Sequence, residues 1–109
     1  MDNNEMLRKM RAGKFMENNG MVLRTINILR HKFERLKDVK YAVDAEMSET
    51  EYLDSINFLG EAGYIVLRNA ATKAPANIAD ADYALLEAKV TEKGIRLLGG
   101  DIIDNMIKA

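Results

Sequence analysis

The stretch SETEYLDSINFLGEAGYIVLR, residues 48–68, decides the fold because it holds one complete helix followed directly by a strand. Ser48 is a favourable N-cap, and Glu51 three residues later completes a capping box. Apolar residues then recur at helical spacing, at Tyr52, Ile56 and Leu59. The pattern predicts a helix over about 49–62.

A strand and a hairpin are predicted after this helix. Gly63 stands where helices commonly end in a left-handed residue, and YIVLR at 64–68 is rich in the β-branched and aromatic side chains that favour strands. Residues 69–82 are small and polar and include a proline, so they are predicted to form a loop. Residues 83–90 are predicted to form a second strand, and the two strands are expected to pair as a hairpin.

Further helices are predicted before residue 48. Residues 1–19 are expected to be a mobile arm or a short helix, ended by the breaker Asn18-Asn19-Gly20. Apolar residues at three- and four-residue steps predict an amphipathic helix over about 21–36. Its apolar positions are Val22, Ile26, Leu29, Phe33 and Leu36, and the first four are expected to share one core with Tyr52, Ile56 and Leu59. Residues 39–47 fit a short helix or a strand, and the helix is favoured.

Two short helices are predicted at the C-terminal end. Thr91 is the N-cap of a helix over roughly 92–98, which stops at Gly99-Gly100. Asp101 is expected to cap a last helix over 101–109. Its apolar stripe consists of Ile102, Ile103, Met106 and Ile107. We expect this stripe to pack on its own domain or on a second copy of the chain, because such a short helix is not stable alone.

Composition fits one domain of 109 residues, with 20–100 as the folded unit. The chain has no cysteine, which excludes a disulfide framework and a thiolate metal site. It shows neither a membrane-spanning apolar run nor a signal-peptide pattern, so a soluble cytoplasmic protein is expected. The net charge is −1, but ten of the sixteen basic residues lie in 1–40 and twelve of the seventeen acidic residues lie in 41–109.

No residue pattern is typical of an enzyme active site. His31 is the only histidine, and no cysteine accompanies it as a metal ligand. Ser48 is explained as a helix cap, and Gly99-Gly100 follows a helix, whereas a phosphate-binding loop follows a strand. The sequence therefore predicts a non-enzymatic protein without a metal, a cofactor or a small-molecule substrate.

The predicted order of helix, short helix, helix, two-stranded hairpin and helix resembles a winged helix-turn-helix domain. The resemblance rests on the apolar helix that ends in EAGYI at 61–65, on the hairpin, and on KVTEKG at 89–94. The length and the Thr-Glu-Lys-Gly ending are also similar to small winged-helix proteins of Mu-like prophages. The resemblance implies an α+β fold with a three-helix core, a two-stranded β wing, and N- and C-terminal helical extensions.

The same resemblance implies a DNA-binding transcriptional regulator whose third helix enters the major groove. The candidate DNA contacts are Arg30, Lys32, Arg35, Lys37, Lys40, Ser55, Arg68 and Lys73. The outward face of the third helix holds three acids and no base, which argues against DNA. The alternative is a protein-interaction or adaptor module that keeps the fold without DNA contact. The candidate protein contacts are Asp54, Phe58, Ile102, Ile103, Met106 and Ile107. A homodimer formed through both terminal segments is expected in either case.

Overall fold

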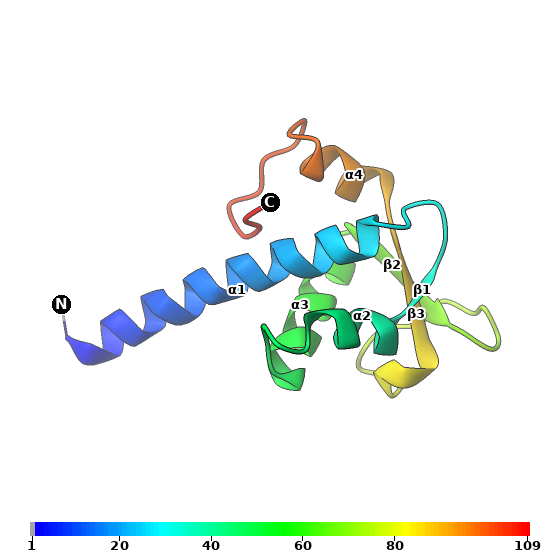
Figure 1. Cartoon of the computed structure of the whole chain (residues 1–109), viewed down its shortest axis with the longest axis horizontal. Coiled ribbons are helices and arrows are strands. Elements are labelled where there is room, and N and C mark those ends of the chain that lie inside the picture. The colour runs from blue at the N-terminus through cyan, green and yellow to red at the C-terminus, as the bar shows by residue number, and fades with distance from the viewer. Residues whose placement is uncertain (1) are drawn as a thin grey trace.

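The computed structural model describes residues 2–109, and these residues form an α+β fold with four α-helices and a three-stranded antiparallel sheet (Figure 1). The α-helices are α1 (Asn3–Asn27), α2 (Leu36–Val43), α3 (Glu49–Glu61) and α4 (Glu92–Leu98). The strands are β1 (Glu34–Arg35), β2 (Ile65–Asn69) and β3 (Leu86–Val90), and a short 3-10 helix, η1 (Tyr83–Leu85), precedes β3. The strand order is β1-β3-β2. The predicted α+β class is confirmed.

Helix α3 has the boundaries that the sequence predicts. The Ser48 hydroxyl accepts a bond from the Glu51 backbone N–H at 3.2 Å, and the Glu51 carboxylate accepts one from the Ser48 N–H at 2.9 Å. Gly63 has a φ of +83°, so the predicted left-handed residue after the helix is confirmed. Tyr52, Ile56 and Leu59 are fully buried and hold α3 against the rest of the core.

The predicted hairpin is confirmed, and it belongs to a larger sheet. Strands β2 and β3 pair in antiparallel register from Ile65 opposite Val90 to Asn69 opposite Leu86. Residues 83–85 form η1 instead of strand because the Asp82 carboxylate accepts a bond from the Ala84 N–H at 2.9 Å. The sequence did not predict β1, whose two residues are too few to show an alternating pattern.

Two predictions about the N-terminal region are wrong, and both concern helix α1. It runs unbroken through Asn18-Asn19-Gly20, so these residues do not end a helix. All three are buried, and the Asn19 amide donates to the Met106 carbonyl at 2.9 Å. Tertiary packing therefore outweighs the low helix propensity of the triplet. The helix also ends at Asn27, well before the predicted end near residue 36.

The chain turns over residues 28–33 and then enters β1 and α2. The favoured helix over 39–47 is confirmed as far as Val43, although α2 begins earlier, at Leu36. Leu36 is fully buried from α2. Leu29 and Phe33 are only half-buried because they lie in the turn, so their predicted place in the core is wrong. The other predicted core residues, Val22 and Ile26 with the three of α3, are buried together.

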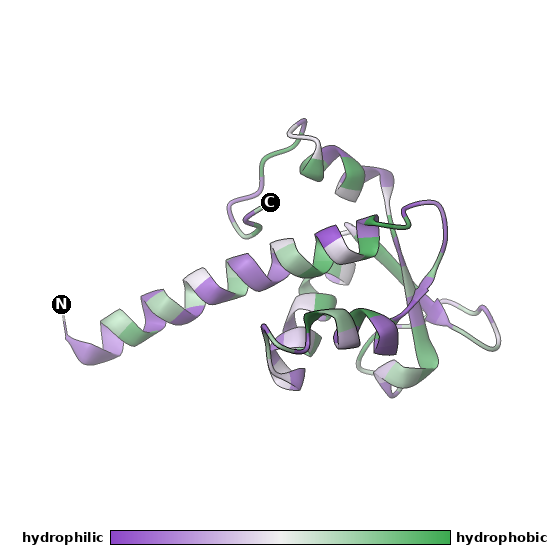
Figure 2. Cartoon of the chain, viewed as in Figure 1, coloured by the Kyte–Doolittle hydropathy of each residue, from purple (hydrophilic) through white to green (hydrophobic). Residues whose placement is uncertain are grey.

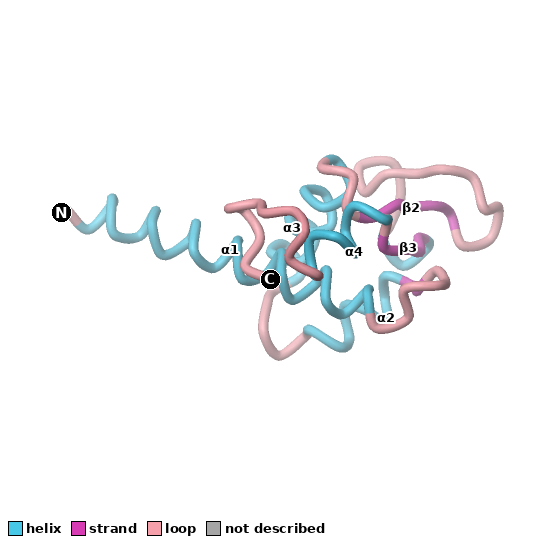
Figure 3. Tube along the Cα trace, turned by 90° about the horizontal axis from the view of Figure 1, so that it is seen from above, coloured by secondary structure: helices cyan, strands magenta, loops and turns pink. Residues whose placement is uncertain are grey.

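Of the two helices predicted at the C-terminal end, one is confirmed and the other is absent. Thr91 caps α4 by accepting a bond from the Gly94 N–H at 3.1 Å. The predicted helix over 101–109 is wrong, because these residues form bends and turns and fold back beside the middle of α1 (Figure 3). The Asp104 carboxylate accepts bonds from the Tyr64 hydroxyl at 2.5 Å and from the Met106 N–H at 2.9 Å. These contacts to the domain hold the segment in a non-helical conformation.

The N-terminal part of α1 projects away from the rest of the molecule (Figure 1). We call residues 3–14 the arm. From residue 2 to residue 12 every side chain is exposed except the half-buried Glu5. Hydrophobic and hydrophilic residues alternate along it (Figure 2), and Met6, Leu7 and Met10 are its large exposed hydrophobic residues.

Candidate interaction surface on helix α3

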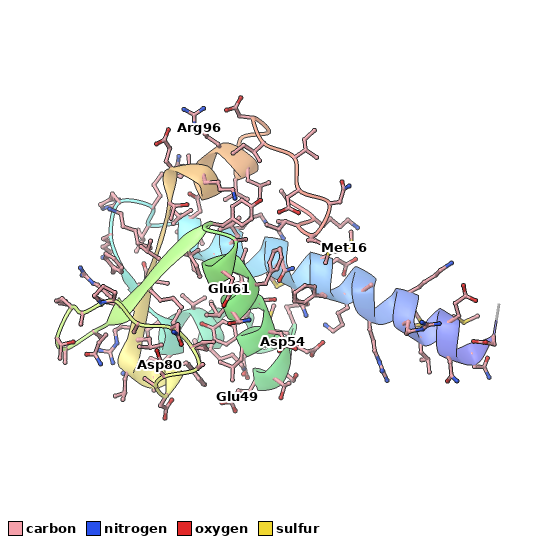
Figure 4. All side chains as sticks on the ribbon, turned by 180° about the vertical axis from the view of Figure 1, so that it is seen from behind. Met16, Glu49, Asp54, Glu61, Asp80 and Arg96 are labelled. Carbon is pink, nitrogen blue, oxygen red and sulfur yellow. The ribbon has the colours of Figure 1, made fainter. Side chains whose placement is uncertain are left out.

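The outward face of α3 is acidic along its whole length. Asp54, Asn57 and Glu61 are exposed one turn apart, and Glu49 is exposed at the start of the helix. Figure 4 shows Glu49, Asp54 and Glu61 at successive positions along the ribbon of α3. No basic residue lies in the last turn of α3. Because a helix C-terminus carries partial negative charge, Glu61 adds no stability there.

An aromatic pair lies beside these acids. Phe15 of α1 and Phe58 of α3 meet edge to face, with ring centroids 5.6 Å apart and planes at 75°. Such a contact stabilises the packing of two helices by more than its buried area alone. Phe58, a predicted protein contact, is therefore half-buried by its own chain, while its remaining surface faces outward between Asp54 and Glu61.

The pair and the acids together form a shallow hollow at the junction of α1 and α3. We call it the acidic hollow; its volume is about 520 Å³, and it is lined by Phe15, Asp54, Asn57, Phe58 and Glu61. A second hollow adjoins it toward the arm and is lined by Arg11, Lys14, Phe15, Asn18, Glu51 and Asp54. The surface thus combines negative charge with exposed aromatic edges, which suits a segment with cationic and apolar side chains.

Ser55 is wrong as a candidate DNA contact. Its side chain is fully buried on the core side of α3. Its hydroxyl has no hydrogen-bond partner among residues 2–109. The residue sits one position beyond the outward face, which is enough to turn it inward on a helix of 3.6 residues per turn.

The two predicted wing cations are engaged within the chain. Arg68 lies with its guanidinium 3.5 Å from the centroid of the Phe33 ring and donates to the Glu87 carboxylate at 2.5 Å. Lys73 donates to the same carboxylate oxygen at 3.1 Å. Burial alone raises the pKa of Glu87, but the bonds from Arg68 and Lys73 outweigh burial and leave the pKa below its ordinary value. Lys73 thus anchors the 70–82 loop to β3, and the charge of both cations is partly neutralised.

Two other basic candidates are also held in the fold. Arg35 is half-buried and donates to the Ala84 carbonyl at 2.9 Å. Lys40 is buried and pairs with Asp44 on the next turn of α2. The remaining candidates Arg30, Lys32 and Lys37 are exposed, in the turn after α1 and at the start of α2. The structure therefore does not gather the predicted basic residues into one surface with α3.

The C-terminal candidates do not form the predicted stripe. Ile107 is buried against its own domain and Ile102 is half-buried, whereas Ile103 is 88% exposed and Met106 is 40% exposed. The Lys108 N–H donates to the Met16 carbonyl at 3.1 Å, which fixes the segment to α1. Of the two packing options predicted for this segment, the structure shows packing on its own domain, at Met16–Arg24 and not at the exposed arm.

Sequence reasoning missed the part that α1 plays in this surface. Phe15 was not singled out, because the predicted break at Asn18-Asn19-Gly20 separated it from the domain. The available signal was the run of helix formers over residues 5–12.

Within residues 2–109, no three His, Cys, Asp or Glu side chains are grouped so as to hold a metal ion. No helix in this part of the chain combines the length and the apolar character needed to cross a membrane. Comparisons with known proteins found no matching family model, no matching curated protein and no matching solved structure.

Proposed function

We propose that this chain is a non-enzymatic, winged-helix-type interaction module whose third helix binds protein in place of DNA. The order α1-β1-α2-α3-β2-β3 and the pairing of β2 with β3 support the winged-helix assignment. In that assignment, α3 is the helix that enters the major groove in DNA-binding relatives, and the 70–82 loop is the tip of the wing.

The acidic outward face of α3 is the observation that carries the proposal. Binding to DNA requires cations that face the phosphates, and this term supplies most non-specific affinity. Asp54 and Glu61 would instead bring two carboxylates to the phosphate walls of the groove. The same carboxylates favour a basic protein segment, and Phe15 and Phe58 offer it an apolar contact.

A second candidate function is DNA binding, as a transcriptional regulator, through another part of the molecule. It is favoured by Arg30, Lys32 and Lys37, three exposed cations within eight residues. Contacts of this kind would bind any duplex through its phosphates and would weaken steeply with added salt.

Fluorescence polarisation with a labelled duplex at low salt separates these two functions. The protein-interaction proposal predicts no saturable binding by the wild type, and none by R30E/K32E/K37E. Binding that the triple variant weakens, and that falls by about one power of salt for each lost phosphate contact, would replace the proposal with the second candidate.

A further inference from the structure

The arm meets its own domain only at its inner end, where Arg11 and Lys14 border α3. Residues 3–10 extend beyond it, and so short a helical segment is only marginally stable in water without packing. Gly13 weakens it further, and an added Cβ there would meet no atom within 4 Å. The Asp2 cap and the Glu5–Lys9 pair at 4.0 Å are small contributions. The arm therefore needs a surface to pack on.

The side of α1 that borders α3 continues outward along the arm. Arg11 and Lys14 line the hollow beside α3. One turn earlier on the same side of a helix come Leu7 and Arg8. Leu7 is 46% exposed and Arg8 is exposed, so this side of the arm presents one apolar side chain and three cationic ones, Arg8, Arg11 and Lys14.

This side of the arm matches the acidic hollow. Leu7 suits the aromatic edges of Phe15 and Phe58, and Arg8 and Arg11 suit Asp54 and Glu61. The chain already uses the same chemistry internally, since the Lys14 ammonium lies 3.6 Å from the Glu51 carboxylate and donates to the Glu46 carbonyl at 2.9 Å.

The outer part of the arm, with Leu7 and Arg8, cannot reach the acidic hollow of its own chain. Arg8 precedes Phe15 by seven residues on one continuous helix, which places it about 10 Å farther along the axis. Only a break in α1 would let it double back. We propose that the arm of a second copy of this chain occupies the acidic hollow, and that two copies exchange arms reciprocally. This inference rests on the proposed function and names the partner of α3.

Reciprocal exchange closes the assembly. The arm and the hollow lie along the same side of α1, so two antiparallel α1 helices related by a two-fold axis would fill both hollows at once. A pair of this kind leaves no further arm or hollow open, as expected for a closed dimer.

Light scattering coupled to gel filtration tests the exchange. The wild type is expected at twice its 12.3 kDa chain mass. R8E is expected to weaken the dimer by about tenfold, because each substitution acts twice in a symmetric pair. K9E is the matched control, since Lys9 is the next residue, lies on another side of the helix, and undergoes the same charge change. Equal effects of R8E and K9E would overturn the proposal.

A charge swap separates loss of the interface from loss of the fold. R8E/R11E and D54K/E61K are each expected to be monomeric because both place like charges at both contacts. Mixed together, they are expected to form a heterodimer, since each arm then meets a hollow of opposite charge. Failure of the mixture to associate, when far-UV circular dichroism shows both variants folded, would overturn arm exchange.

The two proposals fail in different ways. A wild type that stays monomeric at high concentration and does not bind DNA overturns arm exchange but leaves α3 as a protein-docking surface. Saturable DNA binding that D54K/E61K strengthens and R30E/K32E/K37E weakens would overturn the proposed function itself, whatever the mass of the protein.

Discussion

Gly20 marks a close approach between α1 and the C-terminal segment. A Cβ at this position would lie 1.9 Å from the Lys108 carbonyl oxygen, so G20A must push the segment away from the helix. We expect G20A to lower the free energy of unfolding by about 1–3 kcal/mol. G13A, which meets no atom, should raise it by about 0.5–1 kcal/mol through helix propensity. Urea unfolding followed by circular dichroism measures both, and a stabilised G20A would contradict this packing.

Tyr64 and Asp104 make the stability of the C-terminal segment depend on pH. Burial, and then the nearby Asp104 carboxylate, raise the pKa of Tyr64 to about 12. The bond from the Tyr64 hydroxyl, and then the bond from the Met106 N–H, lower the pKa of Asp104 below its ordinary 3.8. The folded state thus binds the Asp104 proton less readily than the unfolded state does. The stability from Asp104 is present above pH 3.8 and is lost as the pH falls through the lowered pKa.

Comparing wild type with Y64F across pH tests this linkage. Y64F removes the hydroxyl, and at neutral pH it should cost about 1.5–3 kcal/mol, as expected for a hydrogen bond to a charged group. The difference in the free energy of unfolding between wild type and Y64F should narrow in acid, when Asp104 is protonated. A difference that stays constant from neutral pH down to acid would show that the hydroxyl does not act through the Asp104 carboxylate.

Local rules predicted the residues whose partners are near in sequence. Ser48 and Glu51 cap α3 across three residues, and Thr91 does the same for α4, so spacing alone identifies them. The buried Asn19 could not be predicted in this way, because it is bonded to a carbonyl 87 positions later. The pattern predicted a break where the fold requires a small residue and a buried amide.

Helix α3 has two roles, because one side of it builds the core and the other builds the proposed surface. I56A or L59A should lower the free energy of unfolding by about 2–5 kcal/mol, since both side chains are fully buried. I103A is the control, as Ile103 is 88% exposed, and it should change stability by less than about 0.5 kcal/mol. Chemical denaturation of the three variants measures this, and core variants as mild as I103A would contradict the packing of α3.

Two elements with clear local signals were predicted, and others depended on distant partners. The pattern over 49–62 and the strand at 64–68 were sufficient for α3 and β2. Strand β1 exists only because its two residues pair with Ala88 and Glu87 of β3. The 101–109 segment has apolar residues at helical spacing, but bonds to α1 and Tyr64 hold it in turns. Its short pattern was too weak to outweigh those contacts.

The uneven charge along the chain has a spatial counterpart in the folded protein. The arm carries exposed cations at Arg8, Lys9 and Arg11, while α3 carries exposed acids at Glu49, Asp54 and Glu61. The cations lie on α1 and the acids lie on α3, which packs against α1. The arm nevertheless points away from its own α3 (Figure 1). The net charge of −1 leaves little repulsion between copies, so complementary surfaces can associate.

Intermolecular paramagnetic broadening tests the proposed contact between the arm and α3 most directly. The chain has no cysteine, so N3C carries a single spin label near the end of the arm. Spin-labelled N3C protein without ¹⁵N would be mixed with ¹⁵N-labelled wild type. Only the wild-type signals are then observed, so any broadening must come from contacts between copies. Arm exchange predicts broadened amide signals for Asp54, Asn57 and Phe58. Unchanged signals across α3, in a sample that light scattering shows to be dimeric, would contradict it.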